Sequence, residues 1–334
     1  MFNPQTQHLA MMKNAAFSLR RSPAEDLAEW QERARSQLGR LIGLPSGCCS
    51  PDLEIEWTHE ADGVREMRFS FNTEENYRAR AHLLIPQHDT PVPVVICLQG
   101  HSKGMHISLG RPKFPGDAES INGGDRDFAR QIVREGYAAF VLEQRAFGEC
   151  GGTPDGPACH QPAMAALLLG RTLLGERVWD VMRSVDLIRD HFTELDAERI
   201  AVMGNSGGGT TTIYAAAMDT RIAAAMPSCA FCGFEASIGA LYHCVCNYVP
   251  GIMNYFDMGD LAGLIAPRPL VIVNGAQDTI FPLESAKEQF GIAETYYVSA
   301  DAAGKISHVI GAEGHRFYAA QGWKNFNELT GWKK

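Results

Sequence analysis

Residues 200–209 place a serine between glycines, directly after an apolar run. Residues 204–208, Gly-Asn-Ser-Gly-Gly, fit the pattern G-x-S-x-G, in which a tight strand-to-helix turn exposes a serine hydroxyl. Glycine flanks the serine because a side chain there would collide with the neighbouring strand or helix. A glycine turn in any α/β unit would match the same letters, so the pattern needs partners elsewhere in the chain. Ser206 is the candidate nucleophile.

A serine hydroxyl needs a general base, and the base needs a group that fixes its tautomer. Asp278 and His315 each follow a predicted strand, and the chain order Ser, Asp, His is the order that accompanies this turn. Taken alone, Asp278 could cap a turn before Pro282 and His315 could be an ordinary loop histidine. His308 is a rival base, but within a strand its side chain would point to a face of the sheet. We predict a triad of Ser206, Asp278 and His315.

Acyl transfer also needs N–H donors for the negative charge that develops on the carbonyl oxygen. We expect the backbone amide of Gly207, next to the nucleophile, and the backbone amide of His101, in the loop after an earlier strand. The His101 imidazole could also reach a substrate. Arg145, at another strand end, could hold a substrate carboxylate or phosphate, or could pair with Glu143 or Asp155.

A cysteine-rich stretch offers a different chemistry. Cys229, Cys232, His243, Cys244 and Cys246 could together supply soft ligands to zinc. The Cys-x-Cys spacing is unusual for a zinc finger, and reduced buried cysteines are common small apolar residues. We therefore expect no metal and no cofactor.

Composition limits the partners. The 334 residues are 45% hydrophobic and 21% charged, which suits one large core or two moderate ones. A net charge of -9 argues against nucleic acid or an anionic membrane as partner, and no apolar stretch reaches the roughly 18 residues of a membrane span. Nine cysteines suit reduced thiols, and the N-terminus has no signal-peptide pattern, so we expect a cytoplasmic protein. Residues 1–24 lack Asp and Glu and would also suit a transit peptide.

The elements that would position these residues alternate between strand and helix, which predicts an α/β fold. An antiparallel meander is expected over residues 53–85. The further predicted strands are 93–99, 137–142, 199–203, 222–226, 269–274 and 305–310. The predicted helices are 125–135, 164–190, 210–218, 283–290 and 317–329.

Residues 1–50 are predicted to be an N-terminal helical extension of a catalytic domain at 51–334. Ser22-Pro23-Ala24-Glu25 fits a capping box, and the helix after it carries one apolar face. This helix should dock on the body of the domain or on a second subunit, which would make the protein a homo-oligomer. Residues 231–266 form an irregular, cap-like insertion at a strand end, where it could cover a pocket.

From residue 53 onward the chain resembles the α/β-hydrolase superfamily, and within it the dienelactone-hydrolase-like and acetyl-xylan-esterase-like bacterial hydrolases. The likeness lies in residues 98–101 (Leu-Gln-Gly-His), 204–208, 264–270 before Asp278, and His315. It implies an α/β-hydrolase fold: a mostly parallel eight-stranded sheet with strand two antiparallel and helices on both faces. It also implies the triad named above and no cofactor.

Two positions depart from these relatives. Dienelactone hydrolases use a cysteine nucleophile where this chain has Ser206, and Gln99 stands where many relatives have histidine. The resemblance therefore indicates the catalytic mechanism more clearly than it indicates the substrate. We expect a serine carboxylesterase that acts on a small or sugar-borne ester through an acyl-enzyme.

Two other functions stay open at this point. The triad equally permits a serine peptidase or amidase, although such oligopeptidases usually carry a large propeller before the hydrolase, and only about 50 residues precede it here. A non-catalytic binding protein on this fold would be expected to lack a triad residue, and all three are in the sequence.

Overall fold

A single sheet organises the chain. The computed structural model describes residues 3–88 and 91–333. Within these ranges nine strands are found: β1 (Glu54–Ala61), β2 (Val64–Glu74), β3 (Tyr77–Pro86), β4 (Val92–Leu98), β5 (Ala138–Leu142), β6 (Leu195–Asn205), β7 (Ala224–Ser228), β8 (Leu270–Gly275) and β9 (Ile306–Gly311). Their order in the sheet is β1-β2-β3-β5-β4-β6-β7-β8-β9.

The predicted α/β-hydrolase fold is confirmed, with one strand more than the resemblance implied. Strands β4 to β9 pair in parallel, whereas β3 pairs antiparallel with both β2 and β5. The additional strand is β1, which forms a hairpin with β2 at one edge of the sheet. Its residues alternate in polarity like the rest of the predicted meander, so the sequence signal for it was present.

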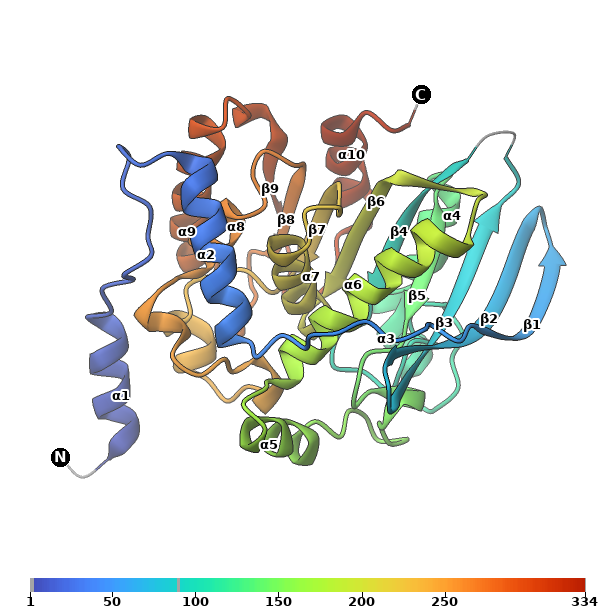
Figure 1. Cartoon of the computed structure of the whole chain (residues 1–334), viewed down its shortest axis with the longest axis horizontal. Coiled ribbons are helices and arrows are strands. Elements are labelled where there is room, and N and C mark those ends of the chain that lie inside the picture. The colour runs from blue at the N-terminus through green and yellow to red at the C-terminus, as the bar shows by residue number, and fades with distance from the viewer. Residues whose placement is uncertain (1–2, 89–90, 334) are drawn as a thin grey trace.

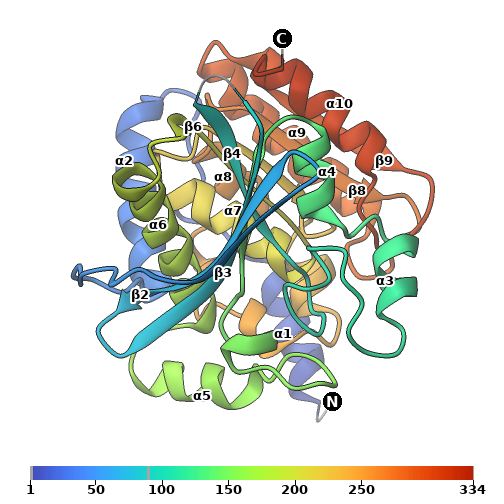
Figure 2. The same ribbon diagram turned by 90° about the vertical axis from the view of Figure 1, so that its right-hand side faces the viewer.

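Helices cover both faces of the sheet. They are α1 (Pro4–Lys13), α2 (Leu27–Leu41), α3 (Asp117–Gly123), α4 (Phe128–Arg134), α5 (His160–Leu168), α6 (Leu173–His191), α7 (Gly207–Met218), α8 (Met258–Gly263), α9 (Leu283–Ser299) and α10 (Ala319–Thr330). Figures 1 and 2 show α2, α6 and α7 on one side of the sheet and α4 and α10 on the other. Of the described helices, none is both long and apolar enough to cross a membrane.

The central strands are apolar along their whole length because both of their faces are covered. In β4, Val94 and Ile96 point into the core under α6 and α7, while Val95 and Cys97 point into the core under α4 and α10. All four side chains are fully buried. This double burial fixes the register of β4 and therefore the place where its carboxyl end delivers the next loop.

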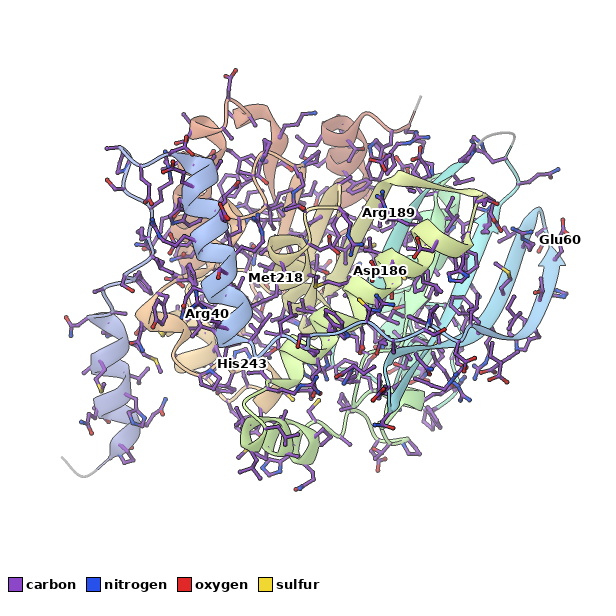
Figure 3. All side chains as sticks on the ribbon, viewed as in Figure 1. Arg40, Glu60, Asp186, Arg189, Met218 and His243 are labelled. Atoms are coloured by element: carbon purple, nitrogen blue, oxygen red, sulfur yellow. The ribbon has the colours of Figure 1, made fainter. Side chains whose placement is uncertain are left out.

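The N-terminal region differs from the prediction in its first turn. Helix α2 begins at Leu27, where the Asp26 side chain accepts a hydrogen bond from the Glu29 amide at 3.0 Å, so the capping box at Ser22 is wrong. The predicted apolar face is buried, and α2 packs along α7 (Figure 3, where Met218 at the end of α7 lies beside α2). Helix α1 was not predicted, and each of its residues is at least partly exposed.

The helix predicted over 164–190 is two helices. Gly170 adopts a left-handed φ of 72° between α5 and α6, and the Thr172 side chain caps α6 by accepting from the Gly175 amide at 2.9 Å. The insertion that follows β7 consists of short helical turns, among them a 3-10 turn η3 (Val245–Asn247), and ends in α8. These turns lie beyond the carboxyl ends of the parallel strands (Figure 1).

Candidate active site

Ser206 occupies a strained turn between β6 and α7. Its φ of 55° and ψ of -121° are unusual for a residue with a side chain, and its amide is held by the Ser228 carbonyl at 2.8 Å. The flanking glycines have a steric cause. A β-carbon on Gly208 would lie 2.2 Å from the Leu98 carbonyl oxygen, and one on Gly204 would lie 2.5 Å from backbone atoms of Gly208. The turn therefore forms only with glycine on both sides.

Asp278 and His315 meet at the next loops along the same sheet edge. Asp278 follows β8, His315 follows β9, and the His315 Nδ1 atom lies 2.8 Å from the Asp278 Oδ2 atom. The other carboxylate oxygen, Oδ1, accepts from the Ile280 amide at 2.8 Å and the Phe281 amide at 3.1 Å. Phe281 also stacks on the His315 ring, with ring centroids 5.9 Å apart. The carboxylate is thus oriented from both sides.

Burial and hydrogen bonding act in opposite directions on Asp278. Its side chain is inaccessible to solvent, and burial alone would raise its pKa. The hydrogen bond and charge of His315, together with the two backbone amides, outweigh burial and hold the pKa below its usual range. Asp278 is therefore a carboxylate at neutral pH, as a partner that fixes a histidine tautomer must be.

Parallel pairing of β6, β7, β8 and β9 brings these residues to one edge of the sheet. The carboxyl ends of parallel strands face the same side, so Ser206, Asp278 and His315 all lie there. The loop after β4 reaches the same place, because a β-carbon on Gly100 would lie 3.0 Å from the Ser206 β-carbon. The structure thus gathers the predicted residues, which are spread over more than 100 positions of the chain, at one side.

Gly207 and His101 are neighbours at this edge. Gly207 is the first residue of α7, where backbone amides have no partner within the helix and carry the positive end of its dipole. A β-carbon on Gly207 would lie 2.6 Å from the His101 ring, so only glycine allows this approach. The two residues predicted to supply amide donors are adjacent, next to Ser206.

The rival base His308 lies elsewhere. It is part of β9, where its ring stacks on Phe290 with centroids 5.0 Å apart and its Nε2 atom lies 3.0 Å from the Asn274 side-chain oxygen. Burial, with the charge of Lys287, lowers its pKa to about 4. His308 therefore belongs to the packing of a sheet face, as its position within a strand predicted.

Arg145 is occupied by protein carboxylates. Its guanidinium binds Asp180 at 2.8 Å and Glu74 at 2.7 Å, contacts Glu176 at 3.5 Å, and lies over the Tyr77 ring. Neither of the partners considered from the sequence, Glu143 or Asp155, is among these contacts in the described structure. Arg145 is nearly buried, and it ties α6 to β2.

Glu143 has a role that the sequence analysis missed. This buried carboxyl group follows β5 and accepts hydrogen bonds from the Met105 amide at 3.1 Å, the Glu149 amide at 3.3 Å and the Gln99 side chain. Burial raises its pKa to about 7. It supports the loop that carries His101, and the available signal was an acidic residue directly after an apolar strand.

The cysteine-rich set divides into separate sites. Cys229 lies against the Asp278–His315 pair, with ligand atoms within 4.8 Å of one another, and its thiol donates to the Arg316 carbonyl. The Cys232 thiol contacts the Gly233 carbonyl. His243 contacts the Ser237 hydroxyl through Nε2, near the start of α6 (Figure 3). The structure therefore does not bring Cys229, Cys232, His243, Cys244 and Cys246 together, and Cys244 and Cys246 have other neighbours, described below.

Comparison with known proteins agrees with this geometry. The sequence profile of the Abhydrolase family matches residues 6–297, which is most of the chain. The chain belongs to the Abhydrolase family. The resemblance to the α/β-hydrolase superfamily that the sequence motifs suggested is thereby confirmed.

Curated relatives of this Abhydrolase family member extend over different shares of it. YtaP of Bacillus subtilis strain 168 is 26% identical over 292 residues, which is 84% of this chain and 92% of YtaP. Its name assigns YtaP provisionally to the hydrolases. The quorum-quenching protein AidA of Acinetobacter baumannii strain MDR-ZJ06 is 27% identical over 161 residues, covering 47% of this chain and 42% of AidA.

Solved structures share the fold at lower identity. A Bacteroides fragilis protein provisionally named an acetyl xylan esterase superposes with a TM-score of 0.79 at 17% identity, covering 98% of this chain and 90% of that one. A glucuronoyl esterase from Solibacter usitatus superposes with a TM-score of 0.72 at 15% identity, covering 95% and 97%. The chain is thus a hydrolase of the α/β family whose structural neighbours are esterases.

Proposed function

We propose that this Abhydrolase family member is a serine esterase that cleaves carboxylic esters through a triad of Ser206, His315 and Asp278. The observation that carries the proposal is the 2.8 Å hydrogen bond between His315 Nδ1 and Asp278 Oδ2 at the sheet edge where the strained Ser206 lies. That bond leaves the Nε2 atom of His315 to accept a proton. The acetyl xylan and glucuronoyl esterases among the structural neighbours support an ester as the substrate.

In the proposed reaction, the Ser206 hydroxyl oxygen attacks the ester carbonyl carbon while its proton passes to His315 Nε2. The amides of Gly207 and His101 stabilise the negative charge on the carbonyl oxygen. Collapse of this intermediate releases the alcohol, which takes the proton from His315 and leaves an acyl group on Ser206. Water then attacks the acyl-enzyme by the same route and releases the acid.

We propose small esters or acetyl esters of sugars, because acetyl xylan esterases are among the neighbours and the Arg145 guanidinium is already bound by Asp180 and Glu74. If the Arg145 guanidinium had no protein partner, it would instead indicate a negatively charged substrate.

The test is Ser206→Ala with p-nitrophenyl esters of increasing acyl length, run beside peptide anilides. We expect the wild type to hydrolyse esters and the variant to lose that activity, with an unchanged circular dichroism spectrum. A fluorophosphonate probe should label the wild type at Ser206. Turnover near the wild-type rate in Ser206→Ala, or labelling at another residue, would remove Ser206 from the mechanism, and preference for anilides would make the protein an amidase.

A further inference from the structure

Four metal-ligating side chains meet behind the loop after β4. The His101 imidazole and the thiols of Cys159, Cys244 and Cys246 all offer ligand atoms within 4.8 Å of one another. The His101 Nε2 atom lies 3.1 Å from the Cys246 sulfur, which lies 3.3 Å from the Cys244 sulfur. Cys159 and Cys246 are buried, and Cys244 and His101 are partly exposed.

We propose that His101, Cys159, Cys244 and Cys246 bind one zinc ion. Three thiolates and one imidazole are a common ligand set of structural zinc sites, which are tetrahedral and closed by four protein ligands. With zinc–ligand bonds of roughly 2.0–2.3 Å, neighbouring ligand atoms of a tetrahedron lie about 3.5–3.8 Å apart. The 3.1 Å and 3.3 Å separations are within about 0.5 Å of that spacing, so small movements of the side chains would admit the ion.

Arg177 supplies the charge that such a site requires. Its guanidinium is buried, and its Nη2 atom lies 3.2 Å from the Cys159 sulfur. Zinc with three thiolates and a neutral imidazole carries one net negative charge, and a buried charge is tolerated when an opposite charge lies beside it. In a cluster of neutral thiols, the Arg177 charge would instead be met by the Arg145 carbonyl, the Phe147 ring and sulfur atoms that are weak acceptors.

The four ligands come from three separate segments. His101 lies in the loop after β4, Cys159 immediately precedes α5, and Cys244 and Cys246 lie at η3 in the insertion. The insertion has little regular structure, and a metal ion can hold such a segment in place of a larger apolar core. Because the His101 ring also packs against Gly207, the ion would fix the loop beside Ser206 without contacting a substrate.

This inference departs from the expectation of no metal and also from the zinc set considered from the sequence. The proposed ligand set keeps Cys244 and Cys246 from that earlier set. It leaves out Cys229, Cys232 and His243 and includes His101 and Cys159 instead. It does not depend on the proposed esterase activity, since a closed four-ligand site leaves no position for a reacting water.

The test is the metal content of the full-length protein, purified under reducing conditions without a polyhistidine tag. We expect about one zinc per chain by elemental analysis, and less than about a tenth of that in Cys159→Ser and Cys246→Ser. The matched control is Cys232→Ser, which removes a buried cysteine of the same insertion and should keep its zinc. Replacing zinc by Co²⁺ should produce thiolate-to-cobalt absorption in the wild type and the control alone.

The Co²⁺ titration of the wild-type protein tests the proposed zinc site even if a cysteine variant fails to fold. A wild type that holds no zinc and gives no thiolate–cobalt band when reduced would overturn the proposal. A disulfide between Cys244 and Cys246 in the metal-free purified protein, found by mass spectrometry, would overturn it too. Equal loss of zinc in Cys232→Ser would place the ion elsewhere.

Discussion

Replacing Asp278 by asparagine tests the most specific feature of the proposed site. The Oδ1 atom of Asp278 accepts two backbone hydrogen bonds, at 2.8 and 3.1 Å, so the asparagine oxygen must take that position. The reverse orientation would oppose N–H groups to the amide nitrogen and cost about 1–3 kcal/mol for each buried donor left unpaired. The asparagine NH₂ group therefore faces His315 Nδ1, where the carboxylate oxygen was at 2.8 Å.

That orientation reverses the tautomer of His315. Facing a donor, Nδ1 must accept, so the proton moves to Nε2, the atom that should take the proton of Ser206. We expect Asp278→Asn to lower kcat by about a thousandfold to ten-thousandfold, equivalent to roughly 4–5.5 kcal/mol of barrier. KM should change little because the Asp278 side chain is buried, away from any substrate.

The assay is steady-state hydrolysis of p-nitrophenyl acetate, with the rate of fluorophosphonate labelling as a second measure of the nucleophile. Glu313→Gln is the control, since this exposed acidic residue lies in the same loop as His315 and should keep wild-type activity. If Asp278→Asn retained activity within about tenfold of the wild type, about 1.4 kcal/mol, Asp278 would not orient the base and the proposed triad would lose its acid.

The remaining predictions concern the base, the turn at Ser206 and acid stability. His315→Ala should lose ester hydrolysis and His308→Ala should keep it; the opposite result would move the base into β9. Gly208→Ala should destabilise the fold by more than about 3 kcal/mol, because its β-carbon would overlap backbone atoms of β4. Gly291→Ala, in α9 with nothing near its β-carbon, should raise stability by about 1 kcal/mol, and calorimetric Tm values of both variants check this. Glu66 is buried, which would raise its pKa, but hydrogen bonds from a histidine and an arginine lower it from 4.5 to about 2. The ionised Glu66 should therefore contribute roughly 3 kcal/mol to the free energy of unfolding above about pH 4.5, and this contribution should vanish as pH falls to about 2. The unfolding free energies of wild type and Glu66→Gln, measured with urea, should converge in acid, and a constant difference between them would contradict this prediction.

The sheet and the turn at Ser206 were predictable because local patterns determine them. The run before Ser206 is apolar on both faces of β6, and the glycines at 204 and 208 are required by the close approach of neighbouring backbone. Asp278 and His315 were found because each directly follows a strand, and parallel pairing brings strand ends to one edge. These inferences need only the periodicity of the chain and the connectivity of a parallel sheet.

Side-chain neighbours across loops could not be predicted in the same way. Cys159 lies far from Cys244 in the chain and joins it because α5, which Cys159 precedes, packs against the η3 turn of the insertion. Arg145 was placed correctly at a strand end, yet its partners were not found. Asp180 and Glu74 come from α6 and β2, and the sequence pattern did not indicate which faces of these two elements meet. The break at Gly170 was missed because an apolar helical pattern continues on both of its sides.

The position of β1 has a consequence for how the molecule behaves at high concentration. As the outermost strand it has one neighbour, and all eight of its residues are exposed, so one row of its backbone groups is free to pair with another chain. Glu54 and Glu56 of this strand pair with arginines of β2 and β3, so they give the edge little charge of their own. Two copies meeting edge to edge would instead be kept apart by the long-range repulsion of a net charge of -9. Crowded solutions at low salt should therefore stay free of sheet-extended aggregates, whereas salt or acid would weaken this protection.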